Sequence, residues 1–468
     1  MRDDGAPNPR LEAAAAGRLS WRARVGFGIG DYGLNLYWQA IGFYLFYFYT
    51  DVVGLSAAVT GLIYAIGGVW DAVSDPAMGY VAERTRSRWG SYRPYLLFGA
   101  VPLALAFAAM FTVPGAFSGT AMAVAAGATL LLYHTAYTAV SIPYSSLGAR
   151  VSYNSRERTK LAGTRMYFAF LGGVSVIALA GTFRNLFDPP AAFGQLAVAC
   201  GVLSVIALLI CFHNTTEQPL VSAKSRPAVS LRELLVTVVR NRPFLLVLGG
   251  ILFVTVGMTF ITKTALYHFE YALGDRAAGD VALFILAGAP LITIPVWSLV
   301  AVKIGKRNTW LAGSAVSMIG LAALYLDRTG SVDMALLTYG LISLGISSYA
   351  VAFWSMLPDT IEYGEYRTGV RNEAVVIGLV SSSQKGALAG SALMLGLLLE
   401  FISYRPGIPQ SAETLQGLRS IITLVPIAAI ACGVAVIASY PISTRVHREI
   451  VTALASRSRA GDQGHSAT

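Results

Sequence analysis

The feature that most constrains this chain is a series of long apolar runs. A helix needs about 20 apolar residues to cross the hydrocarbon core of a bilayer, and the 468-residue sequence contains twelve such runs. Only 13% of its residues are charged, whereas soluble domains carry about 25%. The runs occupy residues 25–48, 55–80, 94–113, 118–143, 160–184, 190–212, 243–270, 279–301, 309–326, 333–357, 373–402 and 416–440. The sequence therefore predicts an all-α polytopic membrane protein with twelve transmembrane helices.

The twelve runs fall into two sets of six, separated by a polar segment that could form an amphipathic helix from Ser230. Two six-helix bundles are typical of transporters built from repeats around a midplane site, although the two halves share little sequence. The predicted parts are an N-terminal tail (1–24), an N-terminal bundle (25–212), a central loop (213–242), a C-terminal bundle (243–440) and a C-terminal tail (441–468).

The basic residues predict the orientation of the chain. Of 35 Lys and Arg residues, 27 fall in the tails, the central loop and alternate short loops, five lie on the other side, and three lie inside runs. By the positive-inside rule, both tails and the central loop are cytoplasmic. We therefore expect an integral protein of a bacterial inner (plasma) membrane, whose net charge of +10 reflects its loops and not a nucleic-acid partner.

Two carboxylates four residues apart, Asp71 and Asp75, stand within the second run. An ionised carboxylate costs at least ~2.5 kcal/mol at bilayer depth, and this spacing puts both on one helical face. Such a pair is expected to hold a proton, a metal cation or a cationic side chain. Ser74 offers a hydroxyl nearby, and Pro76 frees a backbone carbonyl one turn back. Oxygen ligands of this kind suit a hard cation.

The fourth run carries His134, Thr138 and Ser141 on one face, at i, i+4 and i+7. The two hydroxyls are neutral oxygen ligands, and a histidine can titrate near neutral pH. A buried histidine is more often a satisfied hydrogen-bonding group than a proton carrier. The candidate cation-binding and coupling residues are Asp71, Ser74, Asp75, His134, Thr138 and Ser141.

Further polar residues lie inside other runs. The first run has Asp31, Asn35 and Gln39 at i, i+4 spacing among aromatic residues, which suits a polyhydroxylated ring. Buried charges face a water-filled cavity or one another, and static ion pairs between helices are the alternative reading. The candidate substrate-binding residues are Asp31, Asn35, Gln39, Arg165, Lys263, Trp354 and Lys385.

Several sequence blocks carry a family resemblance, among them GIGDYGLN (28–35), WDAVSDPAMGY (70–80), RTRSRWGSYRP (84–94), YTAVSIPYSSL (137–147) and PDTIEYGEYRTGVRNE (358–373). They resemble the glycoside–pentoside–hexuronide:cation symporters, the melibiose-permease branch of the major facilitator superfamily. The resemblance runs through both halves of the chain. It implies the major facilitator fold and cation-coupled sugar transport by alternating access.

The same resemblance implies residue roles. Asp71, Asp75 and Thr138 match cation-site positions and would form a Na⁺ site in such a protein. Asp31 and Arg165 match sugar-contacting positions, and Lys385 matches a lysine near the cation site.

The sequence departs from melibiose-type members at Ser141, where they carry an acid, at Ser145, where they carry a tryptophan, and at His134, where they carry a glycine. The missing acid favours H⁺ over Na⁺ as the coupling ion. The three departures together disfavour melibiose as the substrate.

The expected function is therefore symport of a sugar or glycoside with H⁺ or Na⁺, by a monomer surrounded by membrane lipid and without a further cofactor. The embedded Arg165, Lys263 and Lys385 favour an acidic sugar such as a hexuronide. A lipid or lysolipid carrier of the same superfamily branch is an alternative, disfavoured by the polar face of the first run. A membrane-embedded enzyme is a weaker alternative, because no hydrolase, P-loop or metalloprotease motif stands in a usable position.

Overall fold

The computed structural model describes residues 19–152, 155–217, 239–369 and 373–465. These residues form long helices and no strand. Ten helices in this part of the chain are long and apolar enough to cross a membrane. Two further helices, α2 (Trp21–Ala40) and α13 (Glu373–Phe401), cover the first and eleventh apolar runs. The all-α, twelve-helix architecture predicted from the apolar runs is confirmed.

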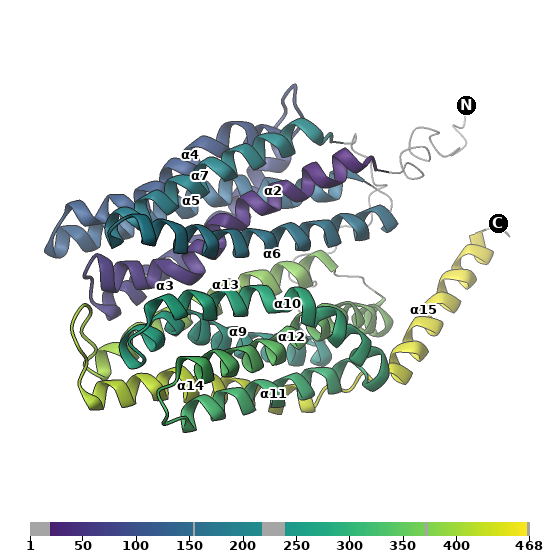
Figure 1. Ribbon diagram of the computed structural model, residues 1–468. Helices are drawn as coiled ribbons and strands as arrows, with labels where there is room; N and C mark the ends of the chain where they lie inside the picture. The colour runs from purple at the N-terminus through teal and green to yellow at the C-terminus, as the bar shows by residue number, and fades with distance from the viewer. Residues whose placement is uncertain (1–18, 153–154, 218–238, 370–372, 466–468) are drawn as a thin grey trace. The chain divides into compact units, whose positions relative to one another are not determined.

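The first compact unit comprises residues 1–224 and 392–409. Its helices pack lengthwise, with α2 between α6 and α7, α4 against α5 and α7, and α3 against α5 (Figure 1). Their bounds are α3 Ala57–Arg84, α4 Arg93–Thr112, α5 Gly119–Val151, α6 Ser155–Leu186 and α7 Pro189–Asn214, with a short 3₁₀ turn, η3, at Pro114–Ala116. Buried aromatic rings from α2, α4 and α5 form part of the core, with Tyr37 and Phe107 centred 4.7 Å apart.

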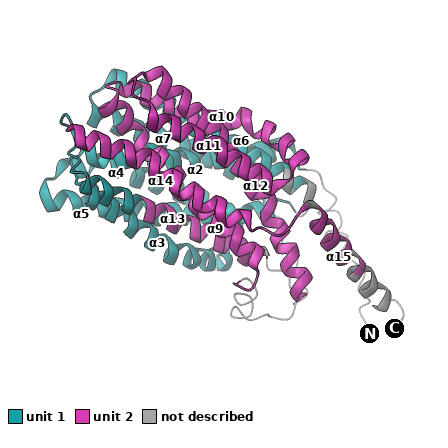
Figure 2. Ribbon diagram, turned by 90° about the horizontal axis from the view of Figure 1, so that it is seen from below, with its two compact units in different colours: residues 1–224, 392–409 teal, residues 225–391, 410–468 magenta. Residues whose placement is uncertain are grey.

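The second unit comprises residues 225–391 and 410–468, coloured magenta in Figure 2. In it, α12 packs against α10 and α11, and α14 packs against α9 and α11. The bounds are α9 Arg242–Tyr267, α10 Arg276–Ile304, α11 Lys306–Leu326, α12 Val332–Thr368 and α14 Ala412–Ala438. One more helix, α15 (Thr444–His465), contacts α12 near its start and extends away from the rest of this unit.

The first helix of each unit ends in the same kind of corner. Helix α2 continues through the π-helical turns η1 (Ile41–Leu45) and η2 (Phe48–Val52), and α9 continues through η4 (His268–Ala272). Gly54 and Gly274 follow, with φ of 87° and 70°, values that favour glycine. A side-chain oxygen of Ser56 or Asp275 then accepts a hydrogen bond from the backbone three residues on and caps the next helix.

The start of α4 is held by a carboxylate from the segment after α7. Glu217 accepts hydrogen bonds from the backbone N–H groups of Ser91, Tyr92 and Arg93 at 2.9, 2.7 and 3.0 Å. Unpaired N–H groups and the helix dipole make a helix start a binding place for an anion. Gly90 has a φ of 106°, and a Cβ at this position would lie 2.4 Å from the Glu217 carboxylate.

The structure differs from the sequence expectations in three places. Residues 357–368, expected in a loop, continue α12 to Thr368, and Gly369 ends the helix with a φ of 73°. Residues 392–409, expected in the C-terminal bundle, cluster with the first unit, where a Cβ on Gly396 would lie 2.2 Å from the Ala57 carbonyl. The C-terminal tail contains α15, which is too polar to register as an apolar run. The helix expected from Ser230 starts outside the described residues.

Candidate functional site

The two acids of α3, Asp71 and Asp75, each contact a polar side chain of α5. We call these four residues, Asp71, His134, Asp75 and Thr138, the ladder, and each contacting pair a rung. The Nδ1 atom of His134 lies 2.9 Å from an Asp71 carboxylate oxygen, and the Thr138 hydroxyl donates to Asp75 at 2.8 Å. Each partner pair repeats at i, i+4, so the rungs stand one helical turn apart. Gly67 permits the close approach of α5, because a Cβ there would lie 2.8 Å from the His134 ring.

The ladder combines groups that can exchange a proton. Asp71 is buried and Asp75 is half-buried, within a helix that contains Pro76. The Nδ1 of His134 donates to Asp71 when this nitrogen carries a hydrogen and the carboxylate is ionised. Two carboxylates and an imidazole in an apolar surrounding can hold one additional positive charge, as a proton or a small cation.

The two serines of the candidate set make no such rung. The Ser74 hydroxyl is buried and has no hydrogen-bond partner among the described residues. Ser141 is half-buried on α5, nearly one turn beyond Thr138. The structure thus brings four of the six candidate coupling residues into direct contact and leaves these two beside them.

A second charged pair links α2 to α6. The guanidinium of Arg165 donates to one oxygen of Asp31 from Nη2 at 2.9 Å and from Nε at 3.3 Å. The same guanidinium lies over the Tyr144 ring, 5.1 Å from its centroid. Asn35 donates to the backbone carbonyl of Asp31 at 2.9 Å, and Gln39 packs beside Gly173 of α6. The polar face of α2 is therefore directed at α6.

Tyr137 of α5 is next to Thr138 in the sequence and was not singled out by the sequence pattern. Its ring stacks on Trp38 with centroids 6.3 Å apart. The phenol is within electrostatic range of Asp31, Asp71 and Asp75. Its position three residues after His134, inside the YTAVSIP block, is the sequence signal that could have identified it.

Three candidate residues belong to the second unit. Lys263 is buried in α9, the Trp354 side chain on α12 is 53% exposed, and Lys385 is half-buried on α13. Lys263 and Lys385 were grouped with residues of the first unit because both are charged residues inside apolar runs.

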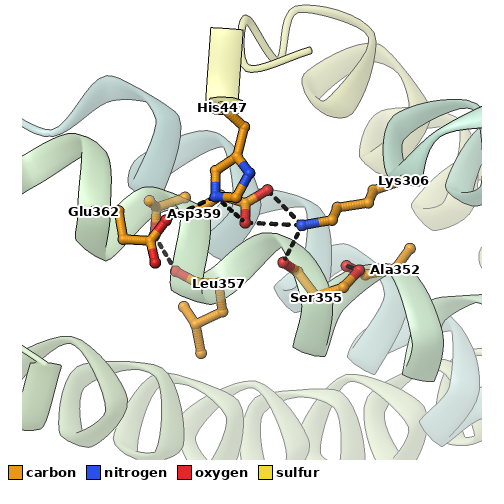
Figure 3. Close-up of polar contacts among 8 residues, drawn as sticks. Lys306, Ala352, Ser355, Leu357, Asp359, Glu362 and His447 are labelled. Atoms are coloured by element: carbon orange, nitrogen blue, oxygen red, sulfur yellow. Dashed lines mark hydrogen bonds and ion pairs between the residues drawn. The ribbon is translucent and has the colours of Figure 1, made fainter. Parts of the chain in front are cut away.

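The second unit also contains a charged cluster that sequence analysis did not identify (Figure 3). Lys306 donates to both oxygens of Asp359 at 2.8 and 2.7 Å. The Nε2 atom of His447 lies 3.2 Å from Asp359 and 2.7 Å from Glu362. The ligand atoms of Asp359, Glu362 and His447 are close enough together for a metal ion. The ammonium group already bound to Asp359 makes this an ion-pair cluster that fastens α15 to α12.

The twelve long helices and the buried polar pairs define an integral membrane protein of the secondary-carrier class. A family model described as MFS/sugar transport protein matches residues 26–444. The chain therefore belongs to this family of the major facilitator superfamily, and it is a transport protein and not an enzyme.

Curated relatives and solved structures agree with this assignment. The chain is 29% identical over 455 residues to a glucuronide carrier protein homolog of Escherichia coli (95% of this chain, 98% of the relative). It is 30% identical over 417 residues to an isoprimeverose transporter of Lactiplantibacillus pentosus (87% and 86%). A solved bacterial homolog of the lysosomal transporter Spinster is 14% identical, with a TM-score of 0.67 over 93% of this chain and 99% of that one. At that identity the likeness concerns the fold alone.

Proposed function

We propose that this protein is a cation-coupled symporter that carries a sugar or glycoside, with an acidic sugar such as a hexuronide as the preferred substrate class. The observation that carries the proposal is the ladder of Asp71, His134, Asp75 and Thr138 in membrane-spanning helices. A cation that relieves the repulsion between two embedded acids can be coupled to substrate binding nearby, by about 1–3 kcal/mol in typical cases.

H⁺ is the coupling ion that this geometry favours over Na⁺. Na⁺ requires several oxygen ligands, whereas Asp71 is engaged by a nitrogen of His134 at 2.9 Å. A Na⁺ site at Asp71, Asp75 and Thr138 would require His134 to turn away. The protein would act without an organic cofactor, as a monomer in a bacterial inner membrane with both termini in the cytoplasm.

The Asp31–Arg165 pair supports a polar substrate and disfavours a lipid cargo. It presents a guanidinium and a carboxylate beside the aromatic residues Tyr144 and Tyr137. Hydroxyl groups of a sugar can bond to both charges, and a sugar carboxylate can bind a guanidinium in bidentate fashion. Relatives of this chain include a glucuronide carrier protein homolog and a putative sulfoquinovose importer, names that are consistent with an anionic sugar.

Vesicles containing the protein test this proposal. Adding a glucuronide should cause proton uptake in wild-type vesicles, and a neutral glycoside should compete weakly in counterflow. Asp75→Asn should abolish uphill accumulation. Asp188→Asn is the matched control, because Asp188 precedes α7 and makes no side-chain capping bond. Na⁺-dependent uptake without proton movement would refute H⁺ coupling. Normal accumulation by Asp75→Asn would refute the assigned role of the ladder.

A further inference from the structure

A groove of about 530 Å³ lies between the first turns of α2 and α6, in the first unit. Trp21, Arg24 and Val25 line it from α2, and Lys160, Tyr167 and Phe168 line it from α6. Helices α2 and α6 lie side by side (Figure 1), and Gly28 lets them approach closely because a Cβ there would lie 2.7 Å from Phe168. Near their starts the two helices leave the groove open.

This groove is separate from the Asp31–Arg165 pair. At about 100° per residue, Tyr167 projects roughly 200° away from Arg165 around α6. On α2, Val25 projects roughly 120° away from Asp31 by the same count. Arg24 lies on the same face of α2 as Asp31 but two turns nearer the start of the helix, and neither Asp31 nor Arg165 lines the groove. A molecule in the groove would not occupy the candidate substrate site.

The walls of the groove are apolar and aromatic at the end of a membrane-spanning segment. The candidate span of α6 begins at Lys160, so the groove lies at the depth where the chain leaves the bilayer. Trp21 and Tyr167 are 71% and 62% exposed. Tryptophan and tyrosine are enriched at the membrane interface because one end of each ring system is apolar and the other polar.

The end of the groove carries a net positive charge. Arg24 and Lys160 each bond to Glu157 at 2.9 Å, so two cations share one carboxylate. The Lys160 side chain is 53% exposed and has three donors, of which the carboxylate uses one. Phosphate oxygens are the acceptors that such partly engaged basic groups bind. Basic pockets between membrane helices bind anionic lipid headgroups in this way.

We propose that this groove binds an anionic phospholipid. Lys160 and Arg24 hold the headgroup phosphate. Trp21, Val25, Tyr167 and Phe168 contact the glycerol and the upper part of an acyl chain. The site combines a cationic end with an apolar slot, so it selects a molecule that is anionic at one end and apolar at the other.

Native mass spectrometry of the purified full-length protein, titrated with phosphatidylglycerol or phosphatidylcholine, tests this site. Phosphatidylglycerol should bind more tightly. Lys160→Gln should weaken its binding roughly fivefold, the effect of one basic residue at a membrane surface. Trp21→Ala should weaken it without touching the ion pairs. Lys303→Gln and Phe187→Ala are matched controls, an exposed lysine of α10 and an exposed aromatic residue just after the last residue of α6.

A third variant has an effect of the opposite sign. Glu157→Gln removes the carboxylate that competes for both cations and should tighten phosphatidylglycerol binding, a result that damage to the fold would not produce. Equal binding of the two lipids, or unchanged binding in all three variants, would overturn the proposal. Displacement of bound phosphatidylglycerol by millimolar inorganic phosphate would show a soluble-anion site and overturn the lipid assignment.

Discussion

At the scale of single residues, the embedded charges of the first unit are arranged in pairs. Asp31 meets Arg165, Asp71 meets His134, and Asp75 meets the hydroxyl of Thr138. Pairing reduces the cost of each charge, since an isolated charge in an apolar surrounding is far more costly than a partnered one. The pairs also make each partner sensitive to removal of the other.

Removing one member of the Asp31–Arg165 pair should destabilise the protein. Arg165→Gln leaves a buried carboxylate unpaired, and losses of about 3 kcal/mol are typical of such changes. Asp31→Asn should have a similar effect, and the double variant should recover part of the lost stability. Thermal unfolding in detergent measures this. A double variant less stable than both single variants would contradict the pairing.

The ion pairs of Glu157 give stability a defined pH dependence. Hydrogen bonds from Lys160 and Arg24 lower the pKa of the Glu157 carboxyl. The folded pKa is then below the unfolded one, near 4.3. The pairs therefore stabilise the fold above that pH, and this stabilisation is lost as pH falls through the folded pKa. Glu157→Gln should lower the Tm at pH 7 and have a smaller effect near pH 3. Glu83→Gln, at an exposed position, is the control. A pH-independent difference would be the contrary result.

At the scale of elements, apolar runs predicted where helices cross the membrane but not what holds their ends. The i, i+4 spacing in the sequence predicted that His134 and Thr138 share one face of the fourth run. It also predicted that Asp71 and Asp75 share one face of the second run. The contact of these two faces depends on the packing of α3 against α5. The hydrophobic periodicity of the sequence does not predict which helices pack together. The contact of Glu217 with the start of α4 and the contact of His447 of α15 with Glu362 of α12 are long-range contacts of the same kind.

Gly90→Ala should destabilise the start of α4. The change introduces a Cβ at a φ of 106° and 2.4 Å from the Glu217 carboxylate. Backbone strain of this kind costs about 1–3 kcal/mol, and the carboxylate must also move. The Tm, followed by tryptophan fluorescence, should fall. Gly115→Ala, where no atom lies within 4 Å, should leave it unchanged. Equal Tm values for the two variants would contradict this account.

His447→Ala should release the start of α15 from α12. The variant removes the imidazole that bonds α15 to Asp359 and Glu362 of α12. Hydrogen exchange in 444–450 should therefore rise, while α12 stays held by Lys306. The matched variant His213→Ala, on α7, should not change exchange there. Unaltered exchange in His447→Ala would contradict this account and would show that apolar contacts, such as those of the buried Ile450, hold the start of α15 without His447.

At the scale of the whole molecule, the sequence predicted the number of membrane helices and the location of the polar residues in them. It did not predict that residues 392–409 cluster with the first unit. The reason is that Gly61 and Gly396 read as ordinary small residues in apolar runs. Only the folded backbone shows that Gly396 packs against the Ala57 carbonyl.

Gly396→Val should separate residues 392–409 from α3. A Cβ at Gly396 would lie 2.2 Å from a backbone oxygen that has no side-chain freedom to move. We expect faster hydrogen exchange in 392–409 and slower transport. Gly390→Val, on the same helix with no atom within 4 Å, is the control and should leave exchange unchanged. Matching exchange in both variants would argue against close packing at Gly396.

The similar corners at Gly54 and Gly274 allow the sequences of the two halves to be aligned. From Phe48 to His268 and from Gly54 to Gly274 the interval is 220 residues in each case. The caps of the next helices, Ser56 and Asp275, are 219 residues apart, and this interval aligns Asp71 with Pro290 and Asp75 with Ile294. The two halves thus share a backbone corner at nearly the same spacing, although the side chains at the aligned positions differ. One half holds the acids, and the other half is apolar at both positions.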